Sequence, residues 1–280
     1  MAGAVSMLGD EPVTGRLVKL GRGNADVLAF IGSEGLGLAE PVAWSYAELT
    51  AVIEAAAAGL AWHGLQRGDV VGVQVGDTAS YILARHAIRA AGGVPTPVAP
   101  DLPVSEVAGQ LAESDARMMI TTPDLAQAAV AAADRSWVRQ VFSFGEAAGT
   151  TPFDSLLALG SLEPVQVRRY EPGLLPFSRS PEGRLRPSPV TQMGLADRLV
   201  ALAARWGLLP RDVVLVDGPA GDGLRFTLGL DCALLSGATV IAARTRDLAG
   251  AAIAQDATAV IALGGRPERL PAEVRLLEFD

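Results

Sequence analysis

Residues 70–98 read VVGVQVGDTASYILARHAIRAAGGVPTPV, and this stretch predicts the fold class. The apolar run at 70–75 is typical of a buried strand. Residues 78–91 follow a helical pattern that ends at a pair of glycines. A second apolar run at 94–98 carries two prolines, which place that strand at a sheet edge or make it irregular. Such a strand–helix–strand unit indicates a parallel sheet with right-handed crossovers.

The same alternation continues on both sides of this unit and predicts an α/β fold. Further strands are expected at 27–31, 118–121, 140–144, 213–216, 239–242, 260–262 and 275–277. Further helices are expected at 46–63, 105–114, 125–133, 151–159, 191–206 and 226–235. A capping box formed by Ser45 and Glu48 marks the start of the first of these helices. Prolines and glycines crowd residues 160–189, which we expect to be the main irregular segment.

The composition excludes several classes of protein. The 280 residues carry a formal net charge of −8 and have no basic stretch that could follow nucleic-acid phosphates. No apolar run reaches the roughly 20 residues of a membrane span, and residues 1–12 lack the basic and apolar regions of a signal peptide. The single cysteine, Cys232, excludes an internal disulfide framework and a Cys-based zinc site. We therefore expect a cytoplasmic protein that binds no nucleic acid.

Lysine is almost absent from the chain. The sequence has 23 lysines and arginines together, and Lys19 is the only lysine among them. Codon bias in a GC-rich genome is enough to explain most of this skew. Any mechanism that requires a lysine would still have to use Lys19, because arginine does not replace it chemically.

Few residues of this sequence suggest catalysis by themselves. His63 and His86 are predicted on different helices with no acid or nucleophile nearby in the sequence, which favours structural roles. Asp217 and Asp222 flank a loop after a strand, the position where open α/β sheets bind ligands. The two aspartates could hold a metal ion or a hydroxyl group. Stabilisation of glycine-rich turns by solvated aspartates is the favoured alternative.

The segment 178–187, SRSPEGRLRP, is the clearest candidate for an anion site. It lies between a short apolar run and a predicted helix, an arrangement in which backbone amides bind phosphate. Its three arginines add positive charge. However, Pro181 and Pro187 lack amide donors, and Glu182 repels an anion. The segment read alone is therefore ambiguous.

Four motifs stand in order along the chain: WSYAEL at 44–49, GLQRGDVV at 64–71, AAGGVPTPV at 90–98 and LSGATV at 235–240. In this order they resemble motifs of the adenylate-forming (AMP-binding) ligases: the acyl-CoA and aryl-CoA synthetases, peptide-synthetase adenylation domains and luciferases. The resemblance covers residues 20–278. It implies two interleaved, mainly parallel α/β subdomains, as in the N-terminal domain of acyl-CoA synthetases, without the family's β-barrel and C-terminal domain. Residues 67–206 would form the first subdomain, and residues 1–66 with 207–280 the second.

The sequence departs from the family where the phosphate loop should lie. Ser178 and Gly183 are kept, but Pro181 and Glu182 replace hydroxyl residues and Arg186 replaces a lysine. A later family histidine corresponds to Asp222. The resemblance places any ligand in the crevice between the subdomains, with candidate binding residues Ser178, Arg179, Gly183, Arg186, Pro219 and Asp222. It places the family's catalytic lysine in the absent C-terminal domain, and Lys19 lies too early to replace it.

We therefore expect a non-catalytic, truncated relative of these ligases, with no catalytic residue, metal or cofactor. It would act by binding a partner protein or an acyl or aryl ligand. One alternative is a component of a split ligase that uses ATP and magnesium and is completed in trans. Another alternative is a purely structural homo-oligomer. A homodimer is expected whether the chain acts by binding or is purely structural, because a shortened fold would uncover apolar surface.

Overall fold

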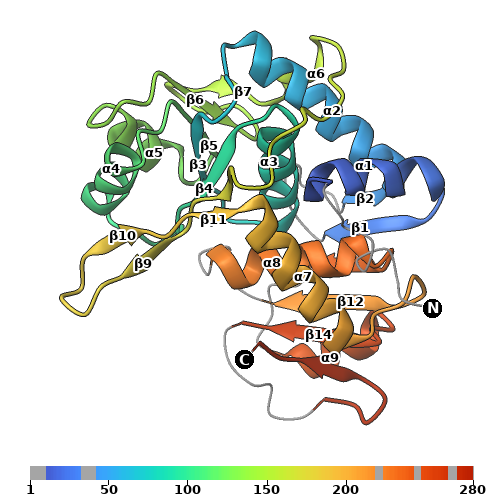
Figure 1. Ribbon diagram of the computed structural model, residues 1–280. Helices are drawn as coiled ribbons and strands as arrows, with labels where there is room; N and C mark the ends of the chain where they lie inside the picture. The colour runs from blue at the N-terminus through green and yellow to red at the C-terminus, as the bar shows by residue number, and fades with distance from the viewer. Residues whose placement is uncertain (1–10, 33–41, 218–222, 243–246, 264–269, 280) are drawn as a thin grey trace.

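The computed structural model of the chain describes residues 11–32, 42–217, 223–242, 247–263 and 270–279. Two mainly parallel sheets lie side by side, each with helices packed against it (Figure 1). The helices α3 (Thr78–Ala90) and α8 (Gly223–Leu235) lie between the two sheets. The predicted α/β class is confirmed, and no closed barrel occurs within these residues.

The first sheet has five parallel strands in the order β4-β3-β5-β6-β7. These strands are β3 (Val70–Gln74), β4 (Val94–Pro97), β5 (Met118–Thr121), β6 (Gln140–Ser143) and β7 (Thr151–Pro152). The strand with two prolines, β4, lies at the edge of the sheet as its sequence predicted. Proline lacks the N–H that a second neighbouring strand would require.

The second sheet has six strands in the order β15-β14-β12-β13-β1-β2. They are β1 (Leu28–Gly32), β2 (Val42–Ser45), β12 (Val213–Asp217), β13 (Thr239–Ala242), β14 (Ala259–Ala262) and β15 (Arg275–Leu277). All neighbours are parallel except β1 and β2. Phe30 of β1 pairs with Val240 of β13, so the start of the chain joins strands from its end. This is the interleaving that the fold class predicted.

The remaining helices pack on the two sheets or on other helices. They are α1 (Val13–Gly23), α2 (Tyr46–Trp62), α4 (Val104–Glu113), α5 (Ala126–Ala133), α6 (Asp154–Leu157), α7 (Gln192–Trp206) and α9 (Leu248–Ala254). The capping box of α2 is confirmed: the Glu48 amide donates to Ser45 Oγ, and the Ser45 amide donates to Glu48 Oε2. Residues 67–206 remain our proposed first subdomain. Its last helix, α7, packs against α8 of the other proposed subdomain.

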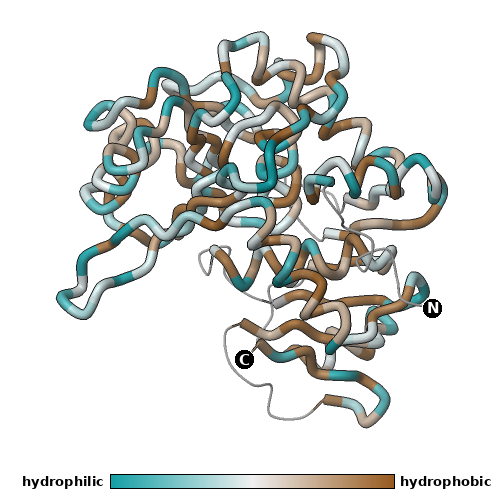
Figure 2. Tube along the Cα trace, viewed as in Figure 1, coloured by the Kyte–Doolittle hydropathy of each residue, from teal (hydrophilic) through white to brown (hydrophobic). Residues whose placement is uncertain are grey.

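Two predictions of local structure were wrong. The helix expected at 151–159 is the short strand β7 followed by the one-turn helix α6. The segment 160–189, expected to be irregular, contains β8 (Pro172–Leu174), β9 (Phe177–Arg179) and β10 (Leu185–Pro187). The strand β8 pairs with β11 (Val190–Thr191), and β9 and β10 form a hairpin that projects from the molecule (Figure 1). The hairpin is largely hydrophilic, which hid its strands from a search for apolar runs (Figure 2).

Candidate functional site

The β9–β10 hairpin carries four of the six predicted binding residues. Ser178 and Arg179 lie in β9, Arg186 lies opposite Ser178 in β10, and Gly183 lies in the connecting turn. Gly183 has a φ of 79°, a left-handed conformation that glycine adopts without strain. The phosphate candidate is therefore a hairpin and not the expected strand–loop–helix. The other two predicted residues, Pro219 and Asp222, fall outside the described residues.

The start of α8 lies close to the base of this hairpin. A Cβ atom on Gly223 would lie 2.9 Å from a carbon of Pro97, at the carboxyl end of β4, and 3.8 Å from Pro176 just before β9. A side chain at Gly223 would thus displace the edge strand. The first sheet, the hairpin and helix α8, which follows strand β12 of the second sheet, therefore meet at this point. Asp217 ends that strand, but its side chain is not among those the structure describes.

The hairpin arginines form ion pairs with helix α4. Arg179 Nη2 lies 2.7 Å from Glu106 Oε2, and Arg186 Nη1 lies 3.1 Å from Glu113 Oε1. The two glutamates are two helical turns apart, so they share one face of α4. Arg179 Nη1 also donates to the carbonyl of Gly183 at 2.9 Å. Both cations that were expected to meet a phosphate already face a carboxylate.

The turn of the hairpin offers few donors to an anion. The Gly183 amide donates to Ser180 O and the Ser180 amide donates to Arg184 O, each at 2.8 Å. Pro181 has no amide hydrogen. The Ser180 hydroxyl, and then the backbone amide of Glu182 itself, lower the pKa of the Glu182 carboxyl, which favours its charged form at the tip. The turn therefore presents a negative charge and few free amide donors.

A row of buried polar side chains, not predicted from the sequence, lies at the carboxyl edge of the first sheet. Gln74, Thr121 and Ser143 are adjacent in the strand register and completely buried. Residues in register on parallel strands project to the same face. Their Oε1, Oγ1 and Oγ atoms have no hydrogen-bond partner in the described structure. Such oxygens require water or a ligand, and this edge is where α/β sheets bind ligands. A polar residue at the carboxyl end of each of three strands is the sequence signal that could have predicted this row.

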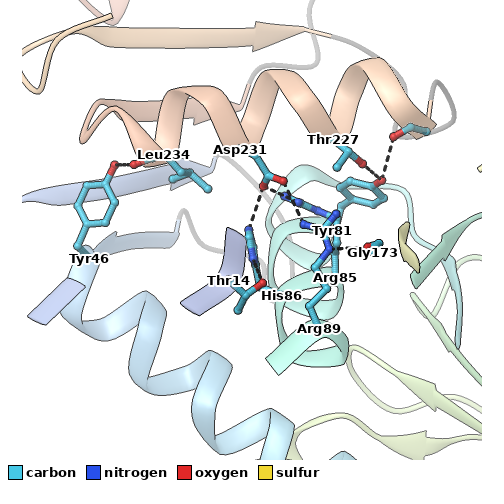
Figure 3. Close-up of polar contacts among 11 residues, drawn as sticks. Thr14, Tyr46, Tyr81, Arg85, His86, Arg89, Gly173, Thr227, Asp231 and Leu234 are labelled. Carbon is cyan, nitrogen blue, oxygen red and sulfur yellow. Dashed lines mark hydrogen bonds and ion pairs between the residues drawn. The ribbon is translucent and has the colours of Figure 1, made fainter. Parts of the chain in front are cut away.

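A second polar cluster, also missed, joins α3 to α8 (Figure 3). Asp231 of α8 lies 2.5 Å from Arg85 Nη1, 3.0 Å from Arg89 Nη1 and 3.2 Å from His86 Nε2. All four side chains are at least 95% buried. The sequence shows no acid near His86, because its partner Asp231 lies far along the chain. No local motif contains both residues.

Charge and burial fix the protonation of this cluster. Burial opposes ionisation of Asp231, but the attraction of Arg85 and Arg89 outweighs it and holds the pKa of that carboxyl well below its ordinary range. Burial, and then repulsion by Arg85, lower the pKa of His86 to about 4. His86 is therefore neutral at pH 7. A proton on Nε2, which faces the Asp231 carboxylate at 3.2 Å, leaves Nδ1 to accept from the Thr14 hydroxyl at 2.9 Å.

The cluster has the parts of a hydroxyl–imidazole–carboxylate triad but does not serve as one. Thr14, His86 and Asp231 are all buried, so a substrate cannot reach the hydroxyl. Arg89 Nε also donates to the Gly173 carbonyl, and Tyr81 Oη lies 2.7 Å from Thr227 Oγ1. These contacts connect α1, α3, β8 and α8. The cluster thus fixes the relation between the two sheets.

Other reactive groups in the described part of the chain add no site of their own. Burial raises the pKa of Cys232 to about 12, so its thiol is unreactive at pH 7. Within the described ranges no group of three or more histidine, cysteine, aspartate or glutamate side chains has the arrangement of a metal site. In the same ranges no helix is long and apolar enough to span a membrane.

The fold described above is that of a known class of protein. A family model described as AMP-binding enzyme matches residues 21–261. The chain belongs to this family. A comparison with curated protein sequences gives no match.

Solved structures show the same fold. A long-chain-fatty-acid-CoA ligase (FadD1) from Archaeoglobus fulgidus superposes with a TM-score of 0.82 at 18% identity, over 90% of this chain and 52% of that protein. MbtA from Mycobacterium smegmatis gives 0.76 at 26% identity, with coverages of 91% and 48%. A benzoate CoA ligase from Burkholderia xenovorans LB400 gives 0.75 at 21% identity, with coverages of 95% and 54%. The chain spans about half the length of these proteins.

Proposed function

We propose that this chain acts by binding and does not form an acyl adenylate. Its ligand in this proposal is a partner protein or an acyl or aryl compound, and it uses neither ATP nor magnesium. The acyl or aryl class is supported by the fatty-acid and benzoate ligases among the similar structures. A cytoplasmic location is part of the same proposal.

The observation that carries this proposal is the pairing of the hairpin's cations with carboxylates. Adenylation requires cations that stabilise the negative charge developing on phosphorus. Arg179 and Arg186 each already face a glutamate of α4, and Glu182 adds a further carboxylate at the turn. A triphosphate placed on this hairpin would be repelled by three carboxylates, those of Glu106, Glu113 and Glu182.

An exchange assay tests this proposal. Purified protein is incubated with Mg-ATP, labelled pyrophosphate and a panel of straight-chain fatty acids and benzoates. We expect no acid-dependent exchange of label into ATP above a protein-free blank. An active benzoate CoA ligase in the same assay sets the sensitivity. Acid-dependent exchange by this chain alone would overturn the proposal.

One observation favours a component of a split ligase as a second candidate. The side chains of Arg179 and Arg186 are 52% and 56% exposed. Ion pairs this exposed contribute little, so a polyphosphate could displace the glutamates. Under this alternative the chain alone binds Mg-ATP, and a second polypeptide supplies the remaining catalytic groups. Under the first proposal the chain does not bind Mg-ATP.

A further inference from the structure

A polar pocket of about 370 Å³ opens at the amino-terminal edge of the five-stranded sheet. It lies where β3, β5 and β6 begin, whereas the buried polar row lies where these strands end. The side chains that matter in it are those of His63, Gln66, Asp69, Arg117, Arg139 and Gln140. Its volume is within the range of small-molecule sites, roughly 300–1,000 Å³. None of these residues belongs to the hairpin.

Two arginines enter this pocket from neighbouring strands. Arg117 directly precedes β5 and Arg139 directly precedes β6, where Met118 pairs with Gln140. The Arg139 amide donates to the Arg117 carbonyl at 2.9 Å, so the register extends to this pair. Their side chains therefore start from strands about 4.8 Å apart and project to the same face. Two like charges placed in this way repel each other.

Among the residues that the structure describes, only Arg117 of this pair has an ion-pair partner. Arg117 Nη2 lies 2.7 Å from Asp115 Oδ2. The Arg139 guanidinium makes no ion pair or hydrogen bond with any residue that the structure describes. An anion bound between the two guanidinium groups would relieve their repulsion and give Arg139 a counter-charge. Phosphate suits this arrangement, because each arginine can contact separate oxygens of one group.

The other side of the pocket offers hydrogen-bond acceptors. Asp69 Oδ2 accepts from the Gln66 amide at 2.9 Å, which leaves the second carboxylate oxygen available. His63 Nδ1 lies 3.1 Å from Gln140 Oε1, and Gln140 Nε2 donates to Thr151 Oγ1. The imidazole therefore donates from Nδ1 and has Nε2 free to accept when neutral. These two acceptors suit hydroxyl groups and not a second anion.

We propose that this pocket binds a small phosphomonoester that carries hydroxyl groups. Arg117 and Arg139 hold the phosphate, and Asp69 and His63 accept from the hydroxyls. The site is independent of the proposed function, since it shares no residue with the hairpin and lies at the opposite edge of the sheet.

Calorimetric titration at constant ionic strength tests the assignment. The probes are glycerol 3-phosphate, inorganic phosphate and glycerol. Glycerol 3-phosphate is expected to bind saturably at one site per chain, inorganic phosphate at least threefold more weakly, and glycerol not at all. Arg139→Gln should weaken glycerol 3-phosphate binding at least tenfold. Arg135→Gln, a matched change at an exposed arginine outside the pocket, should leave the affinity within twofold.

Each other outcome contradicts a stated part of the proposal. The absence of saturable binding of both phosphates to the wild-type protein overturns the site. Equal effects of the two arginine variants, with unchanged melting temperatures, overturn its location. Asp69→Asn should weaken glycerol 3-phosphate more than inorganic phosphate, and an equal effect on both would overturn the role of Asp69. Succinate binding as tightly as glycerol 3-phosphate would overturn the phosphate class.

Discussion

Asp231 is the residue on which the contact between α3 and α8 depends most. Asp231→Asn would leave two buried guanidinium groups without a carboxylate, because Arg85 and Arg89 both pair with it. Removing one partner of a buried ion pair costs about 3–5 kcal/mol. We expect a loss of this size in urea unfolding, or a variant that fails to fold. The control Asp134→Asn changes an exposed aspartate, and a similar loss in both variants would contradict the account.

The buried histidine makes stability depend on pH. The unfolded chain takes up a proton at His86 near pH 6.5, whereas the folded chain does so only near pH 4. Stability contributed by neutral His86 is therefore complete above pH 6.5 and is lost as the pH falls toward 4. The free energy of unfolding should fall between pH 7.5 and 4.5 by about 2–3 kcal/mol more in the wild type than in His86→Gln. Parallel pH profiles would show that His86 does not titrate in this way.

At the scale of elements, α2 and α6 are in direct backbone contact. A Cβ atom on Gly59 of α2 would lie 2.4 Å from the Leu156 carbonyl oxygen of α6. Gly59→Ala must push two backbones apart, and we expect a loss of about 1–3 kcal/mol in denaturant unfolding. Gly109→Ala on α4 is the matched control, because nothing lies within 4 Å of its Cβ position. That variant should be neutral or up to about 1 kcal/mol more stable. Equal losses would refute the close contact.

The elements that the sequence predicted well are those with apolar runs. The strands β5 and β15 have the predicted bounds, because each contains only two or three apolar residues in a row with polar residues beside them. Helix α1 was missed because three glycines lower its helix propensity. Tertiary packing explains one of them: a Cβ on Gly21 would lie 2.5 Å from Thr50 Oγ1, so the glycine permits the contact between α1 and α2.

The candidate site was less predictable than the fold, for two physical reasons. The hairpin residues were identified by resemblance, but their pairing with Glu106 and Glu113 depends on tertiary packing against α4. The cluster around Asp231 joins positions far apart in the sequence that lack a shared motif. Burial of His86 next to a carboxylate follows only from the packing of α3 on α8.

At the scale of the whole molecule, we propose that the chain forms a homodimer. Several large apolar side chains are exposed, with Trp62 at 70% and Ile253 at 66% among the highest. A second copy of the chain would remove such side chains from water, which favours association. Light scattering coupled to gel filtration should give twice the 28.9 kDa mass of one chain. A monodisperse species at the mass of one chain would contradict the proposal.

The central claim, that the hairpin does not hold a nucleotide, is tested most directly by Mg-ATP binding. Purified protein is titrated with Mg-ATP by calorimetry, with its melting temperature recorded alongside. A ligand at a hundredfold excess over its dissociation constant stabilises a fold by about 2.7 kcal/mol, which is visible as a thermal shift. We predict no saturable heat and no shift. Saturable binding with a raised melting temperature would contradict the claim and favour the split ligase.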